Sequence, residues 1–275
     1  MPIVSLRSAK IAYEVAGVGD PTVLVHGSLV DRTSWERVRK GLAPSLTVLT
    51  YDRRGHGEST GAPREHPVRD DADDLADLLG SLDLFPVHVI AHSYGSAVAL
   101  RLASDRPEMV RSLSLHEPPF LALLEEDPAT EPEAERLETA TRAMLERVRS
   151  GDREGAVREV VDSLSLEEGA WDRMGRPVQK TMLRNADRWA EEVSDPEAIR
   201  PNVEAANDLL IPILLTKGER SPPFLHRITD RLASGLRNVT VRTIPGAGHA
   251  PHVSDPDLFI AVIHGFLVER SVPFT

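Results

Sequence analysis

Short apolar runs alternate with longer amphipathic stretches along most of the chain. The runs are rich in Val, Ile and Leu, and they cover Ile3–Leu6, Lys10–Val15, Thr22–Val25, Thr47–Tyr51, Val87–Ala91, Val110–His116, Ile211–Lys217 and Val239–Ile244. The first two flank a short turn and predict a hairpin. The later runs are typical of strands that are buried on both faces of a parallel sheet.

The stretches between these runs have the period of helices. Asp70–Leu82 places alanines and leucines on one face and acids on the other, as an amphipathic helix does. Ser96–Ala103 is rich in Ala and Leu, and Asp255–Val268 closes the chain with apolar residues at helical spacing. Strands that alternate with helices predict a doubly wound α/β fold with a mostly parallel sheet.

One long segment lacks this alternation. Between residues 120 and 208 the sequence shows charged helical patterns, such as Ala134–Arg149 and Asp152–Leu166, and no convincing strand. Because strands flank this segment on both sides, we predict a helical lid of residues 120–208, inserted after the sixth strand. The core domain would then consist of residues 1–119 and 209–275. The alternative is a separate helical domain.

Composition and charge exclude several classes of function. The 275 residues carry 32 Lys and Arg against 43 Asp and Glu, a net charge of −11, without a basic patch for nucleic acid. The absence of Cys excludes disulfides, thiolate metal sites and a cysteine nucleophile. No secretory signal and no apolar run of membrane-spanning length are visible. We therefore expect a cytoplasmic protein without nucleic-acid or membrane partners; the sequence does not indicate an oligomeric state.

The segment after the fifth apolar run carries the most specific chemical signal. A buried strand leads through Ala91-His92-Ser93-Tyr94-Gly95 into a helix. This pattern matches the nucleophile elbow G-x-S-x-G, with Ala91 in place of the first glycine. Small neighbours allow a serine to occupy a strained turn, so Ser93 is the candidate nucleophile. The alternative is a serine that caps an ordinary helix.

Two further motifs fit the same chemistry. His26-Gly27-Ser28 follows the third strand, where the backbone N–H of Ser28 would donate to an oxyanion and that of Tyr94 would be the second donor. Pro245-Gly246-Ala247-Gly248-His249 follows the last strand and presents His249 as the candidate base. The order of a serine and then a histidine after successive strands favours a catalytic histidine over a structural one.

Together these motifs resemble the α/β-hydrolase superfamily, specifically its lidded serine esterase and haloperoxidase-like members. The resemblance rests on Leu24–Ser28, Tyr51–Ser59, Ala91–Gly95 and Gly248–His252, and it covers essentially the whole chain outside the lid. It implies the α/β-hydrolase fold with a catalytic triad and an oxyanion hole. It also implies that Asp52–Gly57 is a structural loop, so that Asp52 and His56 lie outside the catalytic set.

The sequence departs from the family where the acid of the triad is expected. The family usually carries a G-x-x-D pattern after the seventh strand, but this chain reads Gly218-Glu219-Arg220-Ser221. Glu117, directly after the sixth strand, is our candidate acid, because some family members resemble this by carrying the acid there. Glu219, two positions out of register, and a chain without a triad acid remain as alternatives.

A serine nucleophile predicts a serine-dependent hydrolase of carboxylic esters, lactones or thioesters of small to medium acyl groups, acting through an acyl-enzyme. Its partner would be a small-molecule substrate, and no metal and no cofactor are expected. The alternatives are a C–C bond hydrolase, a non-hydrolytic lyase-like or cyclase-like enzyme on the same fold, or a non-catalytic ligand-binding protein. In the lid, Trp171, Met174, Met182 and Trp189 either line an acyl pocket or pack the helices together.

Overall fold

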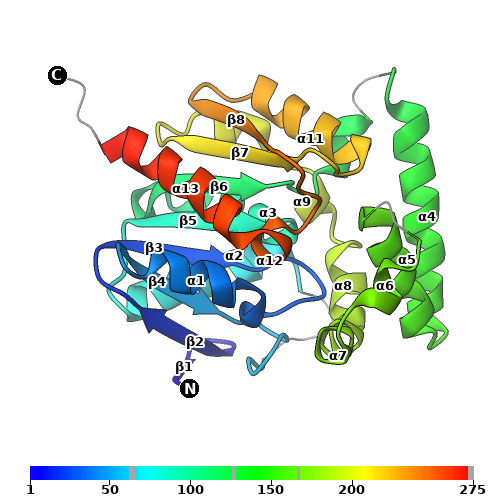
Figure 1. Ribbon diagram of the computed structural model, residues 1–275, viewed down its shortest axis with the longest axis horizontal. Coiled ribbons are helices and arrows are strands. Elements are labelled where there is room, and N and C mark those ends of the chain that lie inside the picture. The colour runs from blue at the N-terminus through cyan, green and yellow to red at the C-terminus, as the bar shows by residue number, and fades with distance from the viewer. Residues whose placement is uncertain (62–65, 126–127, 166–167, 272–275) are drawn as a thin grey trace.

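A single eight-stranded sheet forms the centre of the computed structural model, which describes residues 1–61, 66–125, 128–165 and 168–271 (Figure 1). The strands are β1 (Ile3–Ser5), β2 (Lys10–Ala16), β3 (Asp20–Val25), β4 (Leu46–Tyr51), β5 (Val87–His92), β6 (Val110–His116), β7 (Ile213–Gly218) and β8 (Val239–Ile244). They lie in the order β1-β2-β4-β3-β5-β6-β7-β8. The pairs of β2 with β1 and with β4 are antiparallel, and the remaining neighbours are parallel. The predicted mostly parallel sheet is therefore confirmed.

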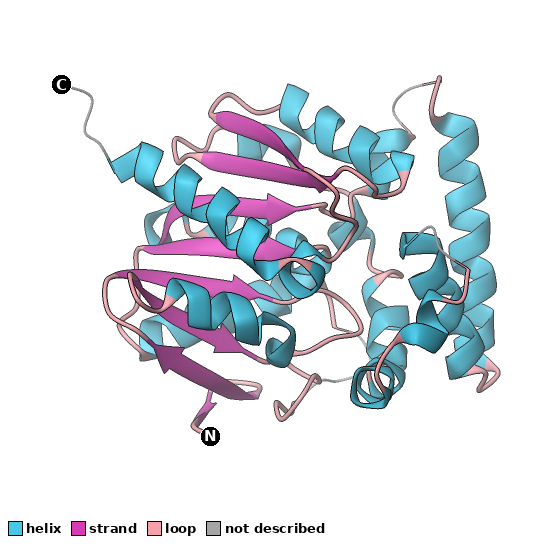
Figure 2. Ribbon diagram, viewed as in Figure 1, coloured by secondary structure: helices cyan, strands magenta, loops and turns pink. Residues whose placement is uncertain are grey.

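Helices cover both faces of this sheet (Figure 2). On one face, α1 (Glu36–Leu42) and α13 (Pro256–Ser271) pack against strand residues such as Leu24 and Ile90. On the other face lie α2 (Val68–Ser81), α3 (Tyr94–Asp105) and α11 (Pro223–Ser234), packed against Val23, Val89 and Ala91 among others. Successive residues of β3 and β5 thus enter different cores, which explains why their sequences are continuously apolar.

A group of helices lies between β6 and β7 in the sequence, although these two strands are neighbours in the sheet. It begins with a short 3-10 helix (Leu121–Leu124) and continues through α4 (Glu131–Arg149), α5 (Arg153–Ser165), α6 (Ala170–Arg173), α7 (Arg176–Arg184), α8 (Ala186–Glu192), α9 (Pro196–Ile199) and α10 (Val203–Asn207). Among the described residues of this segment there is no strand. Helices α4 to α8, here called the inserted helices, have a hydrophobic cluster of their own, which includes Met144, Trp171 and Trp189.

The boundaries differ from the sequence prediction at a few places, for local reasons. Strand β7 begins at Ile213 rather than Ile211, because Pro212 has no N–H to donate to a neighbouring strand. Helices α1 and α11 were not predicted. Leu166, the expected last residue of the second lid helix, lies outside the described residues. Within the described ranges, the helices are too short or too polar to cross a bilayer.

The topology brings the carboxyl ends of the parallel strands to one edge of the sheet. In Figure 1 the arrowheads of β5, β6 and β7 point toward the inserted helices. Strand β5 ends at His92, β6 at His116 and β7 at Gly218. The loops that carry the candidate residues therefore all open toward the same side of the molecule, next to the inserted helices. In open α/β sheets this edge is where ligands bind.

Candidate active site

Ser93 occupies a strained turn between β5 and α3. Its backbone has φ 49° and ψ −123°, a region that a residue with a side chain rarely adopts. The Ser93 N–H donates to the carbonyl of His116 at 2.9 Å, which ties the turn to the end of β6. Gly95 has to be small, because a Cβ there would lie 2.5 Å from the carbonyl oxygen of Val25. The sequence thus forms an elbow that presents the Ser93 hydroxyl, half-buried, at the edge of the sheet.

His249 and Glu117 are directly hydrogen-bonded. The Nδ1 atom of His249 lies 2.6 Å from Oε2 of Glu117. The other carboxylate oxygen, Oε1, accepts a hydrogen bond from the Gly218 N–H at 2.7 Å. Because an ionised carboxylate only accepts, Nδ1 of His249 carries the proton and Nε2 keeps its lone pair. This is the tautomer that a general base requires.

Glu117 is held as an anion in a buried position. Its side chain is completely excluded from solvent, and its backbone has φ 46°, a second strained residue beside Ser93. Burial by itself would raise the pKa of Glu117, but the hydrogen bond with His249 and the neighbouring His116 lower it to about 2. The Ser221 hydroxyl also lowers this pKa. Ser221, which stands where the family usually has aspartate, is thus a neighbour of the Glu117 carboxylate.

Glu219, the alternative acid, makes a different contact. Its Oε2 accepts a hydrogen bond from the backbone N–H of Gly246 at 2.7 Å, in an exposed position. Gly246 belongs to the turn that leads to His249. Glu219 therefore braces the loop before the histidine and leaves the imidazole to Glu117.

The segment His26–Asp31, here called the oxyanion loop because it holds the candidate donor Ser28, runs beside Ser93. A Cβ on Gly27 would lie 3.2 Å from Cβ of Ser93, so the backbone of Gly27 touches the elbow. The N–H of Ser28 donates to no group in the described part of the chain. Tyr94 is the first residue of α3, where N–H groups lack a partner within the helix. Both candidate oxyanion donors thus flank Ser93.

A group of aromatic rings lies behind His249. The Nε2–H of His92 donates to the carbonyl oxygen of His249 at 2.8 Å. The rings of His92 and His252 have centroids 4.4 Å apart, and His252 lies 4.3 Å from the ring of Trp35. Burial lowers the pKa of both His92 and His252 well below the ordinary value, so these rings are neutral. His92 contacts His249 directly, with ring centroids 4.6 Å apart, and His252 packs behind His92.

The inserted helices are hydrogen-bonded to the oxyanion loop. Nδ2 of Asn185, a residue that is 1% exposed, donates to the carbonyl oxygens of Leu29 and Val30 at 3.1 Å each. The Leu29 side chain joins the hydrophobic cluster of the inserted helices. In the same cluster, Trp171 and Trp189 are buried, and Met174 and Met182 pack against it. Sequence analysis did not single out Asn185, because nothing local distinguishes it from a capping residue.

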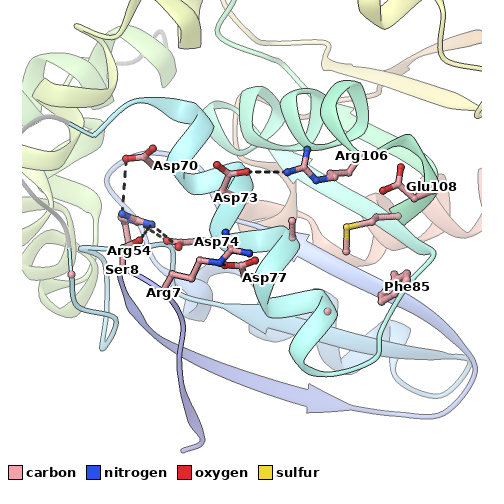
Figure 3. A pocket seen from close by; sticks show the side chains of 14 residues that line it. Arg7, Ser8, Arg54, Asp70, Asp73, Asp74, Asp77, Phe85, Arg106 and Glu108 are labelled. Carbon is pink, nitrogen blue, oxygen red and sulfur yellow. Dashed lines mark hydrogen bonds and ion pairs between the residues drawn. The ribbon is translucent and has the colours of Figure 1, made fainter.

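A groove of about 1010 Å³ lies away from these residues, along α2 (Figure 3). Most of its charged side chains are paired with one another. Arg54 contacts Asp74 at 2.5 Å, Arg7 contacts Asp77 at 3.5 Å, and Arg106 contacts Asp73 at 3.8 Å. We assign this groove no part in the chemistry.

Comparison with known proteins gives one family over most of the chain. The uncharacterized hydrolase YraK of Bacillus subtilis is 38% identical over 118 residues, which is 42% of this chain and 44% of YraK. A thermophilic esterase from Thermogutta terrifontis has 25% identity and a TM-score of 0.79, with 98% of this chain and 99% of the esterase covered. The alpha/beta hydrolase MGS-M2, from a Medee basin deep-sea metagenome library, has 19% identity and a TM-score of 0.82 over the whole of both chains. The model of the Alpha/beta hydrolase family matches residues 22–262, and the chain therefore belongs to that family.

Proposed function

We propose that the chain is a serine hydrolase that cleaves carboxylic esters, lactones or thioesters of small to medium acyl groups through an acyl-enzyme. The observation that carries the proposal is the 2.6 Å hydrogen bond between His249 and Glu117, on the sheet edge where Ser93 occupies its strained turn. A serine, a histidine and a carboxylate in this order are the parts of a catalytic triad. The similarity to a thermophilic esterase supports the same reaction class.

In this mechanism Nε2 of His249 takes the proton of the Ser93 hydroxyl while Oγ attacks the acyl carbon. The N–H groups of Ser28 and Tyr94 donate to the oxyanion that forms. Glu117 stabilises the imidazolium, which then protonates the leaving alcohol or thiol. A water molecule attacks the acyl-enzyme by the same route and releases the acid. Among the described residues Ser93 makes no hydrogen bond to His249, and catalytic bonds of this kind often tighten only with bound substrate.

The position of Glu117, directly after β6, supports this assignment. Strand β6 lies parallel to β7, with His116 opposite Thr216, so the residue after β6 lies beside the end of β7. The usual acid position of the family and Glu117 are therefore adjacent at the same edge. Serine at position 221 leaves the carboxylate of Glu117 as the acid that reaches His249.

The proposal is tested with p-nitrophenyl esters of increasing acyl length, assayed beside a fluorophosphonate probe for active serines. We expect turnover and covalent labelling of the wild-type chain, with both lost in Ser93→Ala. Labelling without ester turnover would overturn the ester assignment and favour a C–C bond hydrolase or a non-hydrolytic enzyme. Neither signal would favour a ligand-binding protein.

A further inference from the structure

Arg53 lies under the oxyanion loop and is completely buried. Its Nε–H donates to the carbonyl oxygen of His26 at 3.2 Å, and one Nη2–H donates to that of Gly27 at 3.2 Å. The guanidinium therefore binds two successive carbonyls of the loop that presents Ser28. Neither the sequence pattern nor the triad accounts for this arrangement.

The contact with Gly27 fixes the direction of the Ser28 N–H. The carbonyl of Gly27 and the N–H of Ser28 belong to one trans peptide unit, in which they point in opposite directions. As long as the Gly27 oxygen faces Arg53, the Ser28 N–H faces away from it. A rotated peptide would present a carbonyl oxygen in place of the N–H and would repel an oxyanion.

His26 holds the same peptide from a second side. Its Nε2 accepts a hydrogen bond from the backbone N–H of Arg53 at 3.0 Å, so the proton of the neutral ring is on Nδ1. Nδ1–H then donates to the Gly27 oxygen at 2.8 Å. The backbone and the side chain of Arg53 thus act on one peptide, the first through His26 and the second directly.

Arg53 is itself held by two carboxylates from different parts of the fold. Its Nη1 lies 3.0 Å from Oδ2 of Asp71 in α2, and its Nη2 lies 2.5 Å from Oε1 of Glu192 in α8. The guanidinium carbon also lies 4.5 Å from the centre of the Tyr94 ring, next to the nucleophile. Glu192 is completely buried and belongs to the inserted helices. The position of Arg53 therefore depends on how these helices dock.

We propose that Arg53 is the positioning residue of the oxyanion hole, and that Glu192 links its position to the docking of the inserted helices. The inference rests on the proposed function, because it assigns Ser28 as an oxyanion donor. Arg53 touches no reacting atom in this scheme. It acts through the Gly27–Ser28 peptide.

The first test compares Arg53→Lys with Arg54→Lys. Both changes keep the charge and alter neighbouring buried arginines, but Arg54 binds Asp74 and contacts no carbonyl of the oxyanion loop. A lysine at position 53 lacks the planar fork that reaches two carbonyls and two carboxylates. Loss of one oxyanion donor costs about 10²–10³ in kcat, and since His26 still binds the peptide we expect about 10² for Arg53→Lys. We expect KM of Arg53→Lys to change by less than about threefold, because the interaction with the oxyanion is made only in the transition state.

A boronic acid that forms a tetrahedral adduct with Ser93 gives a second readout. We expect the affinity of Arg53→Lys for the boronic acid to fall in parallel with kcat. Its affinity for the product carboxylic acid should stay unchanged. In Arg54→Lys both affinities and kcat per folded enzyme stay within about threefold of wild type. If both lysine variants lose kcat equally, or if Arg53→Lys changes KM alone, the positioning role is refuted.

Glu192→Gln tests the link to the inserted helices. It keeps the shape of the side chain and one acceptor oxygen but removes the charge that holds Arg53. We expect a fall in kcat of about tenfold with unchanged KM, since a charge-assisted bond is about twice as strong as a neutral one. Wild-type kcat in this variant would refute the link while leaving Arg53 itself in place.

A crystal structure of Arg53→Lys separates this inference from the proposed function, because it needs no turnover. We expect the Gly27–Ser28 peptide to rotate or to occupy two orientations. A wild-type chain without ester turnover or labelling would refute the proposed function alone. An unchanged peptide in the crystal would refute the positioning role, whatever the activity.

Discussion

Replacing Glu117 with glutamine changes the charge of the site but almost none of its shape. In the native chain one carboxylate oxygen faces His249 and the other accepts from the Gly218 N–H. An amide has only one oxygen, so it satisfies one of these two donors and turns its NH₂ group toward the other. If the NH₂ faces His249, Nδ1 has to accept and the proton moves to Nε2. That tautomer cannot take the proton of Ser93.

Two quantities set the scale of the expected loss of activity. The loss of kcat when a triad aspartate becomes an amide is about 10⁴-fold, or about 5 kcal/mol in the activation free energy. The pKa of Glu117, lowered from 4.5 to about 2, gives the benefit of ionisation in the folded state. At about 1.4 kcal/mol for each tenfold change in acidity, this difference corresponds to about 3 kcal/mol of stabilisation of the anion. We expect the activity loss to exceed that figure, because the transition state adds a full charge on His249.

The assay is steady-state hydrolysis of a p-nitrophenyl ester by wild type, Glu117→Gln and the control Glu219→Gln. We expect kcat to fall by about 10⁴ in Glu117→Gln with little change in KM. Glu219→Gln should stay within a few fold of wild type, because its exposed side chain keeps an oxygen for the Gly246 N–H. A Glu117→Gln enzyme within about tenfold of wild type, or a larger loss in Glu219→Gln, would show that the acid has been assigned wrongly.

Three further outcomes follow from the same structure. Ser93→Ala should lose covalent labelling and turnover while unfolding at an unchanged denaturant concentration, since the half-buried hydroxyl makes no hydrogen bond within the described part of the chain. Detection of labelled Ser93→Ala by mass spectrometry would contradict this. Stability against urea should fall as pH falls from 6.5 to about 4, because burial lowers the pKa of His88 and His116 to about 4, so that the unfolded chain takes up protons which the folded chain does not; a flat profile would refute the reasoning. Asn185→Leu should destabilise by about 1–3 kcal/mol, because the buried carbonyl of Leu29 and the partly buried carbonyl of Val30 lose their donor. Asn238→Leu, which removes one bond to the Leu210 carbonyl at the surface, should cost less, and equal unfolding midpoints for the two variants would count against the burial argument.

The parts of the site that depend on local structure were predictable from the sequence. A continuously apolar strand, a turn of small residues and an Ala-rich helix specify the elbow at Ser93 without reference to the rest of the chain. The same holds for the strand ends before Ser28, Glu117 and His249. Each is a consequence of backbone periodicity and of the few residues that tolerate a tight turn.

Which of Glu117 and Glu219 contacts His249 is decided by the tertiary structure. Both follow strands that end at the same edge, and the sequence gives each a carboxylate. Parallel pairing of β6 with β7 brings Glu117 beside Gly218 and His249, whereas Glu219 turns to Gly246. The difference lies in side-chain direction, which depends on neighbours far away in the sequence.

The contacts of Arg53 and Arg54 also depend on the tertiary structure. They are identical neighbours in one loop, and no periodicity separates them. In the fold, Arg54 binds Asp74 in α2, whereas Arg53 binds the oxyanion loop and Glu192, which lies 139 residues away in the chain. Local sequence determines where the chain turns and which strands are buried, because those preferences are properties of a few adjacent residues. Which buried charge meets which carbonyl was decided only by packing the inserted helices against the sheet, since a desolvated guanidinium is stable only where several distant acceptors converge.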